Sequence, residues 1–92
     1  MSKKNDFIKE LDGVALVTLA SPATVGGVKV DSITMREPSV GDMKIVQNSR
    51  ASDAEKEIAA IANLCELTTA EVEAMSLRNF GRLQAAFKLF TI

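Results

Sequence analysis

The chain has 92 residues and a net charge of −1, with eleven basic and twelve acidic residues. A chain of this length forms a single domain with a modest hydrophobic core. Hydrophobic residues make up 47% of the sequence but aromatic residues only 4%, so aliphatic side chains must fill that core. The balanced charge provides no electrostatic attraction to nucleic acid or to an anionic membrane, and we expect neither as a partner.

The sequence lacks the residues that most enzymes need. Histidine is absent, and with it the commonest general base at neutral pH. The single cysteine, Cys65, cannot form an internal disulfide, and its helical spacing from Ile58 and Ile61 predicts a buried, unreactive thiol in a reducing compartment. The acidic residues of the segment 53–57 stabilise the start of a helix better than they would hold a metal. We therefore expect no catalytic residue, cofactor or metal site.

Two extended segments predict a β-hairpin near the N-terminus. Residues 1–12 are polar and are expected to form a flexible arm, with one domain over residues 13–92. The run from Val14 to Ala20 is rich in β-branched residues and is closed by Ser21-Pro22, as at the end of a strand. A second strand is expected over Val28–Glu37, after a Gly-Gly turn. These segments contain neither an export signal nor an apolar run long enough to span a membrane.

The second strand changes phase along its length. Val28 and Val30 share one face under strict alternation, whereas Ile33 and Met35 lie on the other. An extra residue restores a single apolar face, so a β-bulge is predicted near the segment 31–32.

Capping signals predict three or four short helices after the hairpin, which makes the expected fold α+β. Serine or threonine precedes an acidic residue by two or three positions at several candidate helix starts. The last helix is expected to place an apolar stripe in the core. The signals are Ser39 with Asp42, Ser52 with Glu55, Thr68 or Thr69 with Glu71, and Ser76, and the stripe is Phe80, Leu83, Phe87 and Phe90.

Some apolar residues fall outside these predicted core faces. Val14 and Leu16 occupy the second face of the first strand, and Leu89 and Ile92 lie opposite the stripe of the last helix. Apolar side chains on both faces predict a second contact surface, for a partner protein or for a second copy of the chain. The alternative is that the last helical turn frays and these side chains have no partner.

A DNA-binding interpretation is also open, because a succession of short helices resembles a helix-turn-helix unit. Arg78, Arg82 and Lys88 would then contact the duplex. Three basic groups in a nearly neutral chain are few for binding that phosphate contacts dominate. A solvated helix face explains the same residues.

The order of these signals resembles the tail assembly chaperones of Mu-like phages and related prophages. The resemblance covers about Ala15 to Phe90. Its ordered signals are ITMREPSVGD (33–42), LTTAEVEAM (67–75) and SLRNFGRLQ (76–84), and it is densest over Ile33–Pro38 with Gly41-Asp42 and over Leu77–Gln84. The family often has proline at the positions of Thr69 and Ser76, and aspartate at that of Asn79. The positions that carry the motif are Arg36, Glu37, Pro38, Gly41, Asp42, Leu77, Arg78, Phe80 and Leu83.

The resemblance implies a protein without enzymatic activity that helps to build a phage tail. Such chaperones bind the tape measure protein, keep its helical segments soluble and help to recruit tail tube subunits. They act in the host bacterial cytoplasm and leave before the virion is complete. A structural tail component that stays in the virion is the alternative within the same setting.

Overall fold

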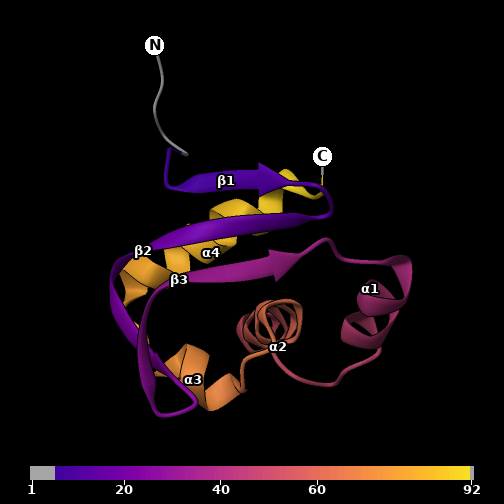
Figure 1. The fold of residues 1–92 in the computed structure, drawn as a ribbon. Helices are drawn as coiled ribbons and strands as arrows, with labels where there is room; N and C mark the ends of the chain where they lie inside the picture. Colours follow the sequence, from indigo (N-terminus) through magenta and orange to yellow (C-terminus); the bar gives the residue numbers. More distant parts are fainter. Residues whose placement is uncertain (1–5, 92) are drawn as a thin grey trace.

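The computed structural model describes residues 6–91, and within this range three strands precede four helices (Figure 1). The α+β class predicted from the sequence, a hairpin followed by short helices, is confirmed. The elements are β1 (Ile8–Leu11), β2 (Val14–Val25), β3 (Val28–Arg36), α1 (Val40–Gln47), α2 (Asp53–Cys65), α3 (Thr69–Glu73) and α4 (Leu77–Leu89).

The strands form one antiparallel sheet in the order β1-β2-β3. The predicted hairpin joins β2 to β3 through Gly26 and Gly27, whose φ angles of +59° and +82° are readily adopted by glycine. Glu71 of α3 fixes this turn, because its carboxylate accepts a hydrogen bond of 2.7 Å from the Gly26 N–H. The tip of the hairpin is therefore attached to the helical half of the molecule.

Residues 1–12 are predicted to form a flexible arm, and this prediction is wrong for Ile8–Leu11. Ile8–Leu11 form the strand β1, which pairs with β2 and places Ile8 opposite Val17. The two residues between these strands include Gly13, whose φ of +77° allows the chain to reverse. Isolated apolar residues in a polar segment were enough to pair with an already apolar strand. Residues 1–5 lie outside the described part of the chain.

A contact with α4 holds the chain just before β1. The guanidinium of Arg82 lies 4.6 Å from the centroid of the Phe7 ring, a cation–π distance. The same guanidinium donates to the carbonyl of Thr18 at 3.0 Å, and the Thr18 N–H donates to the carbonyl of Phe7 at 2.8 Å. Sequence spacing gives no sign of this contact, since Phe7 and Arg82 are distant along the chain.

The irregularity predicted in the hairpin occurs at the expected place, but its extra residues lie in the other strand. The register runs regularly to the pair Thr18–Ser32 and resumes at the pair Ala23–Val30. Residues 19–22 of β2 therefore lie opposite Asp31 alone. The predicted strand end at Ser21-Pro22 is also wrong, because β2 continues to Val25. Proline is tolerated there since a bulge leaves backbone N–H groups outside the ladder.

Asn79 supplies the hydrogen bonds that this bulge does not make within the sheet. Its side chain is 1% exposed and comes from the first turn of α4. The Oδ1 atom accepts from the N–H groups of Ala20 and Ser21 at 2.8 and 3.1 Å, and Nδ2 donates to the Ser21 carbonyl at 2.9 Å. Asn79 thus anchors the bulge of β2 to α4.

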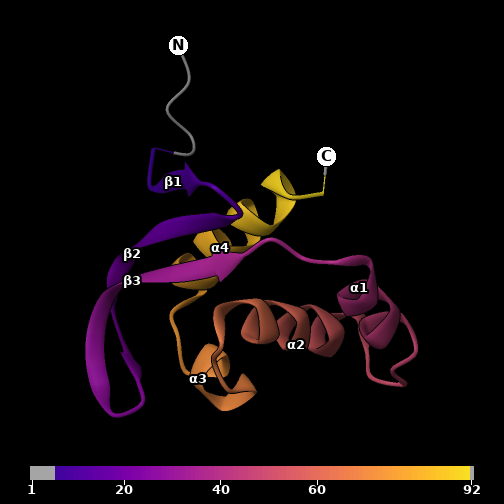
Figure 2. The same cartoon turned by 45° about the vertical axis from the view of Figure 1, so that its right-hand side comes forward.

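The hydrophobic core lies between one face of the sheet and the helices α2 and α4. Figures 1 and 2 show α4 across that face and α2 beside β3. Leu83 is fully buried, and Phe80, Phe87 and Phe90 pack against the core while remaining partly exposed, so the predicted stripe of the last helix is confirmed. The buried core residues are Ala15, Val17, Leu19, Ala23, Ile33, Met35, Ile61, Leu64, Cys65, Leu83 and Ala86.

The helix starts follow the predicted capping signals. Ser39, Ser52 and Thr68 each accept from the backbone N–H three residues later, and an acidic side chain at that position returns the bond. Ser76 caps α4 in the same way, but Asn79 directs its amide to the bulge instead of returning the bond.

We predict that Asn79→Ala lowers the free energy of unfolding by about 1–3 kcal/mol, because one buried side chain satisfies three backbone groups of the bulge. Asn79→Asp should also be destabilising, because its carboxylate still accepts from both N–H groups but cannot donate to the Ser21 carbonyl and is buried. Urea denaturation measures the difference, with Asn48→Ala as the control at an exposed position. Equal stability of the Asn79→Ala and Asn48→Ala proteins would show that the bulge does not depend on α4.

Candidate functional site: an apolar groove between α1 and α2

Helix α1 packs only lightly on the rest of the protein. None of its eight residues is buried, although four of them are apolar. Val40 is 87% exposed, Ile45 73% and Met43 43%. Most short helices in proteins are stabilised by packing of an apolar face, so this exposure is unusual and marks α1 as a candidate contact element.

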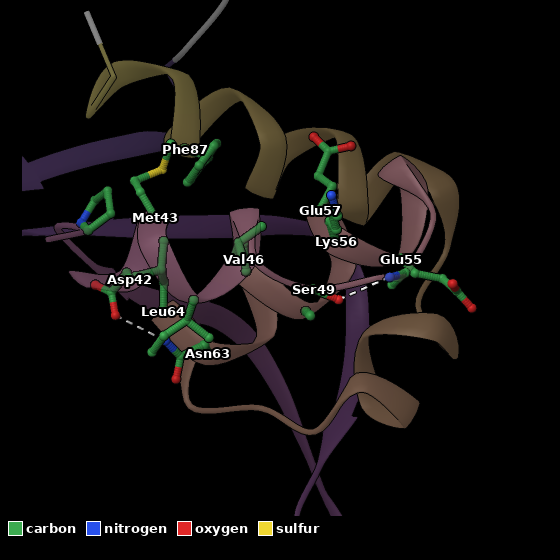
Figure 3. Close-up of a pocket in the computed structure, with 15 residues that line it drawn as sticks. Asp42, Met43, Val46, Ser49, Glu55, Lys56, Glu57, Asn63, Leu64 and Phe87 are labelled. Atoms are coloured by element: carbon green, nitrogen blue, oxygen red, sulfur yellow. Dashed lines mark hydrogen bonds between the residues drawn. The ribbon is translucent and has the colours of Figure 1, made fainter. Parts of the chain in front are cut away.

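The apolar residues of α1 and α2 enclose a groove of about 450 Å³, and Phe87 of α4 reaches into it (Figure 3). Leu64 is the buried residue among those that line the groove, and the others remain partly or fully exposed. The lining consists of Pro38, Asp42, Met43, Ile45, Val46, Ser49, Ala51, Glu55, Lys56, Glu57, Ala59, Ala60, Asn63, Leu64 and Phe87.

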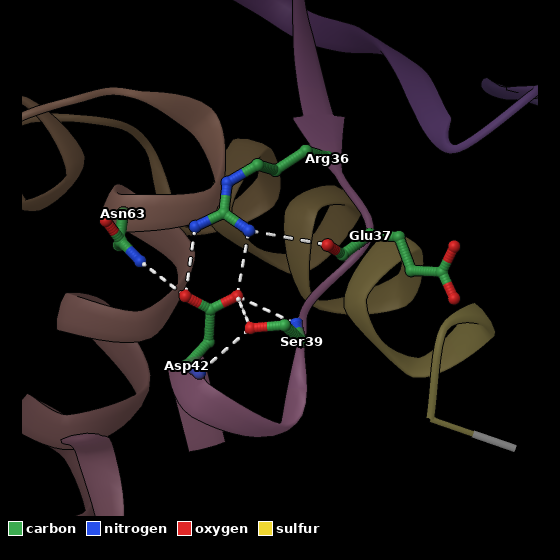
Figure 4. A network of polar contacts seen from close by, with 5 residues as sticks. All are labelled: Arg36, Glu37, Ser39, Asp42 and Asn63. Atoms are coloured by element: carbon green, nitrogen blue, oxygen red, sulfur yellow. Dashed lines mark hydrogen bonds and ion pairs between the residues drawn. The ribbon is translucent and has the colours of Figure 1, made fainter. Parts of the chain in front are cut away.

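A polar network at the start of α1 sets the position of this helix (Figure 4). Arg36, the last residue of β3, forms a two-pronged ion pair with Asp42, with N–O distances of 2.8 and 3.0 Å. The same carboxylate accepts from the N–H of Ser39 at 2.8 Å and from the Nδ2 of Asn63 at 3.3 Å. One side chain therefore connects β3, α1 and α2.

These contacts stabilise the charged form of Asp42. The hydrogen bonds from the Arg36 guanidinium, followed by that from the Ser39 backbone, hold the pKa of the carboxyl well below its ordinary value of 3.8. A carboxyl whose folded-state pKa is depressed contributes stability above its unfolded-state pKa. That contribution is lost as the pH falls through the folded-state pKa, so the network should weaken in acid.

Most polar groups of the groove already have partners within the protein. Asp42 and Asn63 belong to the network, and Glu55 accepts from the N–H of Ser52 at 3.1 Å. Glu57 accepts from the Nε2 of Gln84 at 3.1 Å. What the groove offers to a ligand is therefore mainly apolar surface.

The groove does not include the residues that the sequence predicts as partner contacts. Val14 and Leu16 are partly buried on the sheet face opposite the core, and Leu89 is partly buried in the last turn of α4. Ile92 lies outside the described residues. The role of these four side chains stays a prediction. A signal for the groove was present in the sequence, because Val40, Met43, Ile45 and Val46 are too widely spread around α1 for one buried face.

The motif residues of the resemblance divide into three groups. Arg36, Pro38 and Asp42 surround the start of α1. Glu37 and Gly41 lie in the same segment and are exposed. Leu83 belongs to the core, and Phe80 packs on it. Leu77 is 85% exposed and Arg78 is exposed as well. Arg82, which the DNA-binding interpretation requires, is engaged with Phe7 and Thr18 within the fold.

Reactive groups are sparse in the described residues. Cys65 is 8% exposed, as predicted, and burial raises the pKa of its thiol to about 12. Between residues 6 and 91 no three histidine, cysteine, aspartate or glutamate side chains gather where they could hold a metal ion. Within the same range no helix has the length and hydropathy that a membrane span requires.

We predict that Asp42→Asn lowers the midpoint temperature of thermal unfolding near neutral pH. The midpoint temperature of the variant should also decrease less as the pH is lowered, because the variant lacks the carboxylate that Arg36 and Ser39 stabilise. Unfolding followed by circular dichroism between pH 2 and 7 tests this. Asp31→Asn, on an exposed position of β3, is the control. An acid dependence that Asp42→Asn leaves unchanged would argue against the network.

Comparison with known families places this geometry in context. Residues 16–92 match the model of a family described as "Phage tail assembly chaperone proteins, E, or 41 or 14". Neither curated proteins nor solved structures yield a match to the chain. The matched segment begins in β2 and includes β3 and all four helices named above. It spans most of the sequence and agrees with the resemblance identified from the motifs. The chain therefore belongs to the phage tail assembly chaperone family.

Proposed function

We propose that the protein binds the tape measure protein, keeps it soluble and assists assembly of the tail tube. Membership of the family supports a role in tail assembly, and the apolar groove between α1 and α2 is the observation that favours binding of a chain. In this proposal the chaperone works in the host bacterial cytoplasm and leaves before the virion is complete. It carries out no chemical reaction.

The size of the groove fits a reversible contact. Full burial of one large aliphatic side chain is worth about 1.5–3 kcal/mol, and a groove of about 450 Å³ has room for only a few such side chains. Association also costs translational and rotational freedom, so a single contact of this size is weak. Many weak contacts along a long partner protect its apolar surface together, while each copy can still be released.

We predict that co-expression with the tape measure protein of the same phage makes that protein soluble, and that the two co-purify. The expected cause is coverage of the apolar faces of the tape measure helices. Centrifugation of the lysate and affinity capture through a tag on the chaperone measure both effects.

Purified virions provide the second readout of this experiment. Absence of the chaperone from the particles supports release before completion, whereas a fixed number of copies per virion would identify a structural tail component. A tape measure protein that stays insoluble, or that does not co-purify, would contradict the proposed function.

A further inference from the structure

We infer that the free edge of β3 binds one extended peptide segment, which pairs with it as an added strand of the sheet. This contact surface is separate from the groove between α1 and α2, and the inference does not depend on the proposed function. It gives the molecule a second binding site and states the conformation and the side-chain pattern of the ligand.

The register of the sheet leaves backbone groups of β3 without partners. Residues along an antiparallel ladder alternately bond to the neighbouring strand and turn away from it. The Glu37 N–H donates to the Gly13 carbonyl at 3.0 Å, and pairing with β2 is regular from there back to Ser32. Counting back from Glu37, the N–H and C=O groups of Thr34 and Ser32 therefore point to the free edge. Within residues 6–91 no loop and no side chain is hydrogen bonded to these groups.

A groove of about 370 Å³ lies along this part of the edge and is called the edge groove below. Ser32, Thr34 and Arg36 line one side of it, and residues 64–67, at the end of α2 and just after it, line the other. Figures 1 and 2 show β3 as the strand nearest to α2, but the edge groove keeps the two apart at this point. An added strand therefore has both backbone partners and space.

The opposite edge of the sheet is protected, whereas the edge of β3 is not. β1 is only four residues long and carries Lys9 and Glu10 at its centre. Short length and charged residues are the usual means by which proteins prevent an edge strand from pairing. The segment Ser32–Met35 of β3 contains no charged residue, and the bulge that would distort an edge lies in β2 instead.

The surroundings of the edge groove favour a single strand over a second copy of the protein or a helix. A symmetric dimer formed through β3 would place the sheet of each copy in the space that residues 64–67 of the other copy occupy. A bound helix satisfies its own backbone groups and would leave those of Ser32 and Thr34 unpaired. An extended segment fits the space and pairs with the edge, as in peptide recognition by strand addition.

The two faces of the added strand meet different surroundings, because successive side chains of a strand point to opposite faces. On one face of β3, Ile33 and Met35 are buried and belong to the same core cluster as Leu64. On the other face, Ser32 and Thr34 are exposed. The ligand that fits is therefore apolar at every second residue, with small polar or β-branched residues such as threonine between them.

Three peptides of seven residues test the inference by fluorescence anisotropy. All alternate valine with threonine and end in lysine for solubility. One is unmodified, one is N-methylated at the valines and one at the threonines. Only every second N–H of a strand faces its neighbour, so one methylated peptide should bind at least about tenfold more weakly than the unmodified peptide. The other should bind nearly as well as the unmodified peptide.

Two proline variants locate the site. Thr34→Pro removes an N–H that points to the free edge and none that bonds to β2, so it should weaken peptide binding at least about tenfold. Glu10→Pro makes the same change at the opposite edge, because the Thr18 N–H bonds to the Phe7 carbonyl and Glu10 therefore turns away from β2. It should leave binding unchanged. Thr34→Ala keeps the N–H and should bind the peptide nearly as well as the unaltered protein.

Thermal unfolding followed by circular dichroism shows whether both proline variants are folded. If Thr34→Pro does not fold, the methylated peptides decide the question, because they need no variant. Equal binding of the three peptides, or a loss of binding in Glu10→Pro alone, would overturn the inference. A dimer that Thr34→Pro dissociates would assign the edge to a second copy and would also overturn it. None of these measurements uses the tape measure protein, so they are independent of the proposed function.

Discussion

The carboxylate of Asp42 is the contact on which the arrangement of the groove depends. It receives both prongs of the Arg36 guanidinium, the N–H of Ser39 and the amide of Asn63. Through it, the end of β3, the start of α1 and the last turn of α2 hold one another at a fixed distance. Because α1 has no buried side chain, this polar network supplies the positioning that hydrophobic packing supplies elsewhere in the fold.

The molecule thus combines a firmly packed half with a lightly packed one. The sheet, α2 and α4 share the hydrophobic core, and Asn79 fastens the bulge of β2 to α4. α1 lies outside this core and exposes apolar side chains beside the groove. The packed part carries the fold, so α1 forms one wall of the groove without contributing to the core. The same division explains how apolar surface can be exposed without endangering the core.

Local signals in the sequence predicted much of the fold but little of the site. The serine and threonine caps and the Gly-Gly turn act over a few residues, and the structure confirms them. The pairing of β1, the strand that carries the bulge, the ion pair of Arg36 with Asp42 and the groove all depend on which segments meet in space. The alternation of apolar and polar residues along one strand shows that a register shift is needed. It does not show which of the two paired strands holds the extra residues. The spread of apolar residues around α1 was a signal for the groove in the sequence, but the position of the groove depends on how α1 packs beside α2. Val14 and Leu16 were chosen from their alternation along the strand alone.

Hydrogen exchange is the most direct test of whether the groove is the contact surface. It would be measured for the chaperone alone and in complex with the tape measure protein. Each backbone amide reports whether its own segment is protected. We expect slower exchange on binding across Val40–Gln47 and the groove side of α2, with exchange in the sheet unchanged. Protection confined to the segment 14–19 of β2 and the last turn of α4, with α1 unaffected, would contradict it.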